Sequence, residues 1–329
     1  MQTQQSHSQN MERPLISFIV TYYDLPVKML CECIESILRL PLTREEREVI
    51  VIDDGSKTSP AEELALYEQD IIYIRQTNKG LSEARNTGIR MASAQYLQFV
   101  DGDDLLIQSP YEHCISIARQ KSPDMIVFDF TTNGTVPGTY TDIDMLSGSE
   151  YMRHHNIRAT ACGYLFKRTT LSDLRFTPGI YNEDEEFTPL LLLRADSLCT
   201  TDAQAYYYRQ RQGSIITNPD IRHKLRKLND TRNIISRLNI QADCLPTDER
   251  TALQRRVAQL TMDYIYSIIR QTQSRHYLDR KIESLRKEGL FPLPNRDYTK
   301  KYTWFRRFSN SSHGRSLLMR IIPLMKKER

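Results

Sequence analysis

Several features are scarce or missing in the 329-residue sequence. It contains no run of 18 uninterrupted apolar residues, so no membrane-spanning helix is expected, and no apolar signal-peptide segment follows its start. Its six cysteines lie mostly within apolar runs and show no C-x-x-C spacing, which predicts reduced, buried thiols in a cytosolic protein rather than a disulfide framework. The histidines offer no ligand pair, because the neighbours His154 and His155 would point apart on a helix.

The remaining composition is that of an ordinary soluble globular protein. Hydrophobic residues make up 40% of the chain and charged residues 26%, and the length suffices for one large domain or two ordinary ones. The net charge is +4, yet residues 300–329 hold nine Lys or Arg against one Glu, so the rest of the chain is net negative. Residues 1–14 are polar and rich in glutamine, which predicts a disordered lead-in.

The basic tail, residues 300–329, also carries aromatic and aliphatic side chains. Trp304, Phe305 and Phe308 precede the segment RSLLMRIIPLMKK, in which apolar residues alternate with cations. Apolar residues beside Lys and Arg favour an amphipathic helix lying on an anionic membrane surface over a nucleic-acid partner, so no nucleic acid is expected. The alternative is a terminal helix that packs on the protein with a solvated basic face.

The first part of the chain alternates strand-like and helix-like segments. Strands are expected at residues 15–21, 48–53, 71–75, 96–100 and 124–129, with helices such as 81–93 and 109–120 between them. This alternation predicts an α/β fold with a Rossmann-like, mostly parallel sheet flanked by helices. Beyond about residue 217 the chain reads as helical, at 219–238, 247–273 and 276–289. We therefore expect domains at 15–217 and 218–299, followed by the tail.

Polar or acidic residues follow three of the expected strands. They are TYYD (21–24), DDGS (53–56) and DGDD (101–104), and ligands of such sheets bind at the carboxyl ends of the strands. Asp101 and Asp103, separated by a glycine, could both face Mg²⁺ or Mn²⁺. A solvated loop is the simpler explanation. An EF-hand is excluded by Leu105 and Leu106, whereas a haloacid-dehalogenase-type phosphatase also has D-x-D after a strand, although after its first one.

Two further segments allow a structural and a functional interpretation. In NKGLSEARNTG (78–88), Arg85 is either a surface charge or a counter-charge to a diphosphate. In NEDEEF (182–187), Asn182 and Glu185 resemble a capping box at the start of a helix, and acids in a first turn suit the helix dipole. The same helix start would hold a catalytic carboxylate rigidly, so the two interpretations are compatible.

Taken together, five segments resemble glycosyltransferase family 2, whose members have the GT-A fold. In order they are the stretches SFIVTYYDLPVKMLCECIESIL, EVIVIDDGSKTS, NKGLSEARNTGIRMASAQYLQFVDGDDLL, NEDEEF and YYYRQRQGSI, which cover residues 15–215. The resemblance implies a sheet that binds a nucleotide-sugar, usually a UDP-sugar. It also implies a D-x-D element that holds Mn²⁺ or Mg²⁺ against the diphosphate.

The resemblance assigns a role to each matching residue. It implies that the donor nucleotide is bound by Thr21, Tyr23 and Asp24 around the nucleoside, Asp53 or Asp54 at the uracil, Arg85 at the base or diphosphate, Asp101 at the ribose and metal, and Arg211 and Ser214 near the diphosphate. It implies further that Asp103 is the main metal ligand, that Asp184 is the general base and that Glu183 helps to shape the acceptor site. The acidic neighbours Glu183, Glu185 and Glu186 are expected to raise the pKa of Asp184.

The sequence departs from the family pattern at residues 161–164, Ala-Cys-Gly-Tyr, where an aromatic residue and a lysine are usual, so the donor sugar is left open. The expected activity is that of an inverting, metal-dependent hexosyl- or N-acetylhexosaminyl-transferase. Its acceptor is a glycan or lipid-linked glycan of cell-surface polysaccharide synthesis, at the cytoplasmic face of the membrane. The alternatives are a phosphatase or nucleotidyltransferase that uses the same acidic edge, and a non-catalytic module that binds nucleotide-sugars.

Overall fold

The computed structural model describes residues 13–133, 138–210 and 220–325. Their contacts group the chain into two compact units that alternate along the sequence. The first unit comprises Met1–Asp142, Cys162–Ser172 and Thr201–Arg209, and the second comprises Ile143–Ala161, Asp173–Thr200 and Gln210–Arg329. All six cysteines are free thiols, and four of them are buried.

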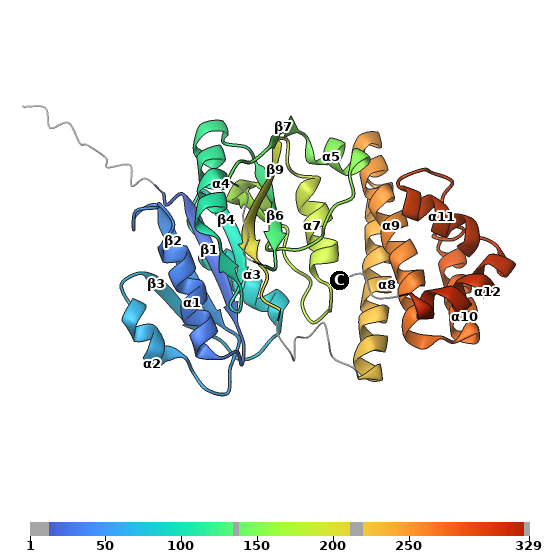
Figure 1. Ribbon diagram of the computed structural model, residues 1–329, viewed down its shortest axis with the longest axis horizontal. Helices are drawn as coiled ribbons and strands as arrows, with labels where there is room; N and C mark the ends of the chain where they lie inside the picture. The colour runs from blue at the N-terminus through green and yellow to red at the C-terminus, as the bar shows by residue number, and fades with distance from the viewer. Residues whose placement is uncertain (1–12, 134–137, 211–219, 326–329) are drawn as a thin grey trace, which may run out of the picture. The chain divides into compact units, whose positions relative to one another are not determined.

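A parallel sheet forms one half of the first unit (Figure 1). Its strand order is β3-β2-β1-β4, with bounds β1 (Ile16–Tyr22), β2 (Arg47–Asp53), β3 (Ile71–Arg75) and β4 (Tyr96–Asp101). Every residue of β1 is buried, as expected of a central strand made largely of β-branched and aromatic residues. The crossovers contain α1 (Val27–Leu38), α2 (Ala61–Leu64) with the short helix η1 (Ala65–Tyr67), and α3 (Leu81–Met91).

The other half of this sheet is joined by antiparallel pairs. Beyond β4 the order is β8-β6-β9-β5, with bounds β8 (Tyr164–Lys167), β6 (Met125–Thr131), β9 (Leu198–Tyr207) and β5 (Leu105–Leu106). The pairs β4–β8, β6–β8 and β5–β9 all run antiparallel. Helices α4 (Gln108–Lys121) and α6 (Arg168–Leu171) complete the unit. The predicted α/β sheet flanked by helices is confirmed, and its antiparallel half is a feature that strand periodicity did not indicate.

Helix α3 lies directly against β1 and β2. A side chain at Gly88 would overlap Ile19 of β1, so this glycine allows the helix to approach the sheet closely. Gly88 is one turn from Arg85, and both residues are on the buried side of α3. The close packing therefore brings a guanidinium to the sheet.

The second unit is mainly helical (Figure 1). Its elements are β7 (Asp142–Leu146), α5 (Gly148–His154), α7 (Asp184–Leu192), α8 (Ile221–Asp243), α9 (Thr247–Thr272), α10 (Arg275–Lys287), α11 (Lys300–Ser309), α12 (Ser312–Ile321) and η3 (Ile322–Leu324). The long helices α8 and α9 lie side by side and bury Ile234, Leu238 and Ile265. The three expected helices are present, and α8 continues five residues past its expected end.

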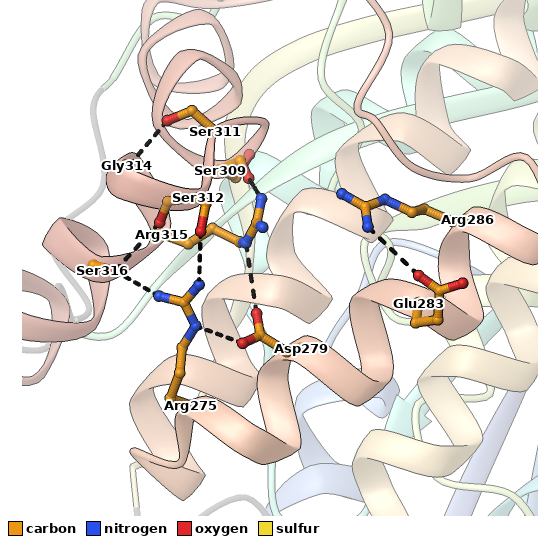
Figure 2. A network of polar contacts seen from close by, with 10 residues as sticks. All are labelled: Arg275, Asp279, Glu283, Arg286, Ser309, Ser311, Ser312, Gly314, Arg315 and Ser316. Carbon is orange, nitrogen blue, oxygen red and sulfur yellow. Dashed lines mark hydrogen bonds and ion pairs between the residues drawn. The ribbon is translucent and has the colours of Figure 1, made fainter.

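Residues 300–325, the described part of the tail, are folded into this unit. Figure 2 shows Arg275 of α10 donating hydrogen bonds to Ser312 and Ser316 of α12, and Arg315 of α12 donating to the Ser309 carbonyl at 2.8 Å. Tyr302 and Leu318 are fully buried, and so nearly is the cation Arg315. The inner face of the tail thus corresponds to the packed terminal helix considered as an alternative. Among the described residues, no helix is both long and apolar enough to cross a membrane.

Candidate active site

The ends of β1, β2 and β4 form one edge of the first unit. In the sheet register Tyr22 lies opposite Asp53, and Thr21 lies opposite Asp101. The segments 21–24, 53–56 and 101–104 therefore meet, as the parallel sheet predicted. The edge is the candidate site, because it collects carboxylates from three loops in one place.

Asp101 and Arg85 form the central ion pair of this edge. The Arg85 Nη2 lies 3.1 Å from the Asp101 Oδ1, and the Thr21 hydroxyl donates to the same oxygen at 3.4 Å. Arg85 is held against the sheet, with only 4% of its side chain exposed and its guanidinium carbon 5.9 Å from the centre of the Phe99 ring. Asp101 keeps 35% of its side chain exposed. The Asp101 carboxylate is thus accessible to solvent, while the buried Arg85 guanidinium compensates part of its negative charge.

Asp104 turns inward, away from its neighbours in the sequence. Its Oδ2 accepts a hydrogen bond from the Tyr206 hydroxyl and its Oδ1 one from the Arg209 backbone N–H, both at 2.8 Å. Burial first, and then the charges of Asp101 and Asp103, raise the pKa of Asp104 to about 8. Asp103 is partly exposed. The three acids of the turn therefore divide into two that face outward and one that belongs to the interior.

Asp53 and Asp54 connect the end of β2 to β3 and to the segment before α3. Asp53 is fully buried, accepts hydrogen bonds from the Ser56 N–H at 2.9 Å and the Tyr73 hydroxyl at 3.0 Å, and lies 3.3 Å from the Arg75 Nε. Asp54 accepts from the side-chain amide of Gln76, and from the backbone N–H groups of Lys79 and Gly80 that lead into α3. Their contact with a uracil stays a prediction.

Tyr23 and Asp24 directly follow the end of β1 at this edge. Tyr23 is exposed, and Asp24 has a left-handed backbone with φ 47°. The Asp24 backbone N–H donates to the Ser56 hydroxyl at 3.0 Å, and its carboxylate accepts from the Lys57 N–H at 2.8 Å. These bonds tie the end of β1 to the loop after β2, which fixes the position of the exposed tyrosine.

The acidic turn, residues 101–104, is supported by residues of β9 and α1 and by Arg209, which the sequence patterns did not indicate. The Tyr206 hydroxyl bonds both Asp101 and Asp104, and the Arg209 guanidinium lies 2.7 Å from Glu32 of α1. The tyrosine-rich run before Arg209 was the only signal in the sequence. Arg211 and Ser214 lie outside the described residues.

The second unit holds the candidate base at a helix start. Asp184 is the first residue of α7, and Glu183 before it is buried. The capping box does not form: the N-cap is Glu183, without a side-chain cap bond, and the Asn182 amide donates to the Thr231 hydroxyl instead. The Asn182 backbone is left-handed, with φ 59°, which differs from the extended backbone typical of an N-cap residue.

The two glutamates after Asp184 are paired with arginines. Glu185 forms an ion pair with Arg256 of α9. Glu186 receives a two-pronged contact from Arg237 of α8, at 2.5 and 2.9 Å, and a bond from the Thr177 hydroxyl at 2.8 Å. Their charges are therefore compensated, and they do not surround Asp184 with the uncompensated negative charge expected from the sequence.

The carboxylate oxygens of the acidic turn are ligands that suit a hard divalent cation. In the part of the chain that the structure describes, no three His, Cys, Asp or Glu residues gather as a complete metal cage. Mg²⁺ and Mn²⁺ do not need one, since one or two carboxylates can hold such an ion together with water and substrate phosphates. The outward-facing Asp101 and Asp103 match this pattern.

Comparisons with known proteins agree with this architecture. The family model "Glycosyl transferase family 2" matches residues 17–172, which include all three loops of the edge. Residues 17–172 therefore form a glycosyltransferase family 2 domain. The glycosyltransferase EpsJ of Bacillus subtilis is 30% identical over 223 residues, which are 63% of this chain and 64% of EpsJ. The glycosyltransferase GlyA of Streptococcus pneumoniae is 28% identical over 61% of this chain and 31% of its own length. Each of these two matches therefore covers less than two thirds of the relative's own length.

Solved structures show the same GT-A fold. Residues 1–349 of Staphylococcus aureus TarS, in complex with UDP-GlcNAc, superpose with a TM-score of 0.61 over 92% of each chain at 17% identity. A mannosyltransferase of Pyrobaculum calidifontis, in complex with GDP-Man and Mn²⁺, superposes with a TM-score of 0.55 at 14% identity. The superposition covers 96% of the chain described here and 88% of the mannosyltransferase. At such identities the likeness concerns the fold alone.

Proposed function

We propose that this chain is an inverting, metal-dependent glycosyltransferase that takes a sugar from a UDP-sugar. The observation that carries the proposal is the edge where Asp101, paired with Arg85, lies beside the end of β1, which is paired in turn with the end of β2. UDP as the nucleotide is supported by the UDP-GlcNAc complex of TarS, which has the same fold. A cell-surface glycan acceptor is supported by a 24% identical relative, the minor teichoic acid biosynthesis protein GgaB of Bacillus subtilis.

In this proposal the edge binds the donor. Thr21, Tyr23 and Asp24 surround the nucleoside, and the loops fixed by Asp53 and Asp54 shape the base pocket. Asp103 and Asp101 would hold Mn²⁺ or Mg²⁺, which when bound supplies positive charge to the leaving diphosphate. Arg85 keeps the Asp101 carboxylate in place and adds a cation at the edge. Arg211 and Ser214 complete the diphosphate contacts.

Asp184 acts in the proposal as the general base. It removes the proton of the acceptor hydroxyl, whose oxygen attacks the anomeric carbon opposite the departing diphosphate, so the configuration inverts. Its position at the start of α7 suits this task, because the first turn is anchored on both sides by the arginine pairs of Glu185 and Glu186. Glu183, buried beside it, shapes the acceptor side.

Titration with UDP and with a panel of UDP-sugars, with and without Mn²⁺, tests the donor site. We expect metal-dependent binding that Asp103→Ala removes, and transfer activity that Asp184→Asn abolishes while UDP binding is kept. Phosphate release from simple phosphate esters without a sugar donor would favour the phosphatase alternative instead. Donor binding without hydrolysis or transfer for any sugar would favour a non-catalytic module, and equal transfer by Asp184→Asn would refute the base.

We propose further that the tail places the enzyme on the cytoplasmic face of the membrane, close to lipid-linked glycans. Lys300, Trp304 and Arg307 are exposed on one face of α11, and Trp304 has 43% of its surface exposed. On α12, Leu317 is 42% exposed and lies one turn before the exposed Arg320. An exposed apolar residue beside an exposed cation on each helix suits an anionic lipid surface.

Vesicle sedimentation tests this placement without removing helices that are packed into the second unit. We expect the protein to bind vesicles containing phosphatidylglycerol, and Trp304→Ser with Leu317→Ser to bind them several-fold less. The matched control is Leu66→Ser, since Leu66 is an exposed leucine of the first unit. Equal binding by the double variant and the control would exclude the tail as the contact.

A further inference from the structure

A single buried hydroxyl joins the two ends of the acidic turn. The Tyr206 Oη accepts a hydrogen bond from the Asp101 backbone N–H at 3.1 Å and donates one to the Asp104 Oδ2 at 2.8 Å. Tyr206 and Asp104 are both buried. The hydroxyl therefore uses its one proton and one lone pair on residues three apart in the turn, with Asp103 between them.

Further hydrogen bonds close the turn on itself and connect it to β1 and to Arg209. The Asp104 N–H donates to the Asp101 carbonyl and the Gly102 N–H to the Thr21 carbonyl of β1, both at 2.9 Å. On the other side, the second Asp104 oxygen accepts from the Arg209 N–H, and the Arg209 side chain pairs with Glu32 of α1. The turn is thus held by β1, β9 and α1 together, and Tyr206 is the member that touches both of its ends.

We propose that Tyr206 is a positioning residue of the donor site, whose hydroxyl, together with Asp104, holds Asp101 and Asp103 in the geometry that receives a divalent cation and a nucleoside diphosphate. This inference rests on the proposed function. It follows from the position of the two bonds: the Tyr206 hydroxyl holds the backbone of Asp101 and the carboxylate of Asp104, which lie on either side of Asp103 in the turn. Substituting groups that orient metal ligands commonly weakens metal binding about 10–100-fold.

The test is Tyr206→Phe, which keeps the ring and removes only the hydroxyl. The control is Tyr96→Phe: Tyr96 is an equally buried tyrosine of the first unit, and its hydroxyl donates to the Pro123 carbonyl at 2.8 Å. Calorimetric titration with UDP at varied Mn²⁺ gives the affinity, and thermal unfolding gives the stability. We expect both variants to unfold at a lower temperature, and only Tyr206→Phe to bind Mn²⁺ and UDP about 10–100-fold more weakly.

A second variant separates positioning from folding. Asp104→Asn replaces one of the two accepting oxygens by an NH2 group, so the side chain can no longer accept from both the Tyr206 hydroxyl and the Arg209 N–H. It should therefore weaken the same binding, and combining it with Tyr206→Phe should add little because the two groups act as one unit. If Tyr206→Phe and Asp104→Asn both bind Mn²⁺ and UDP as tightly as the unmodified protein, the inference is wrong while the donor site stands. If the unmodified protein itself shows no metal-dependent UDP binding, the donor site and the inference fall together.

Discussion

Replacing Gly102 by alanine probes the turn at its tightest point. A Cβ at residue 102 would lie 2.8 Å from the Thr21 carbonyl oxygen, which is a backbone atom of β1 and cannot swing aside. An ordinary contact between carbon and a carbonyl oxygen is about 3.3–3.6 Å. The turn and the strand must therefore separate by roughly 0.5–0.8 Å to accept the methyl group.

That separation has two consequences. The same Thr21 oxygen accepts the Gly102 N–H at 2.9 Å, so relieving the overlap stretches this bond beyond the usual limit of about 3.2 Å. Overpacking of this kind costs about 1–3 kcal/mol of unfolding free energy. For a unit of this size, about 2 kcal/mol lowers the Tm by about 4–8 °C. The shift also displaces Asp101 and Asp103, which we expect to weaken UDP binding with Mn²⁺ by about tenfold.

Differential scanning fluorimetry and UDP titration measure the two effects. Gly138→Ala is the matched control, because a Cβ at Gly138 meets no atom within 4 Å. The reasoning is refuted if Gly102→Ala unfolds within about 1 °C of the control and binds UDP equally well. A lower Tm with unchanged UDP affinity would keep the steric argument and refute the link between the turn and the donor.

Three further predictions concern single contacts. Arg85→Lys should lower the Tm by several degrees and weaken UDP binding, because an ammonium cannot both pair with Asp101 and keep the guanidinium's contact with the Phe99 ring; fluorimetry and titration measure both. Arg237→Met should destabilise the protein by about 1.5–3 kcal/mol in urea unfolding, since it leaves the buried Glu186 with a neutral donor only. Gly88→Ala should lower the urea midpoint, because its methyl group would force α3 away from β1.

Local sequence patterns were sufficient to predict the α/β fold and the candidate edge. Strand and helix periodicity depend on neighbouring residues, and parallel strands with short βα loops necessarily bring their carboxyl ends together. The family resemblance, now confirmed by the family match, added the expected role of each residue. Those roles remain predictions.

Contacts between residues far apart in the chain could not be predicted. Asp104 turns inward because Tyr206, 102 residues later, supplies a hydrogen bond that no local pattern indicates. Glu186 is paired with Arg237, 51 residues away, and the Asn182 amide bonds Thr231 at a separation of 49 residues rather than capping its own helix. The sequence of the tail is amphipathic, but it does not indicate that the inner face of α12 packs on α10, where Arg275 donates to Ser316 (Figure 2).

The alternation of the two units along the chain has a consequence for biosynthesis. During translation, β1 to β4 emerge first, but β8 and the residues Thr201–Arg209, which complete the first unit, are made only after a segment of the second unit. Until Tyr206 of β9 and Arg209 leave the ribosome, the acidic turn lacks two of its anchors and β6 has one unpaired edge. The nascent chain should therefore acquire nucleotide binding late, in one step, and ribosome stalling before residue 206 should yield a chain that aggregates rather than binds.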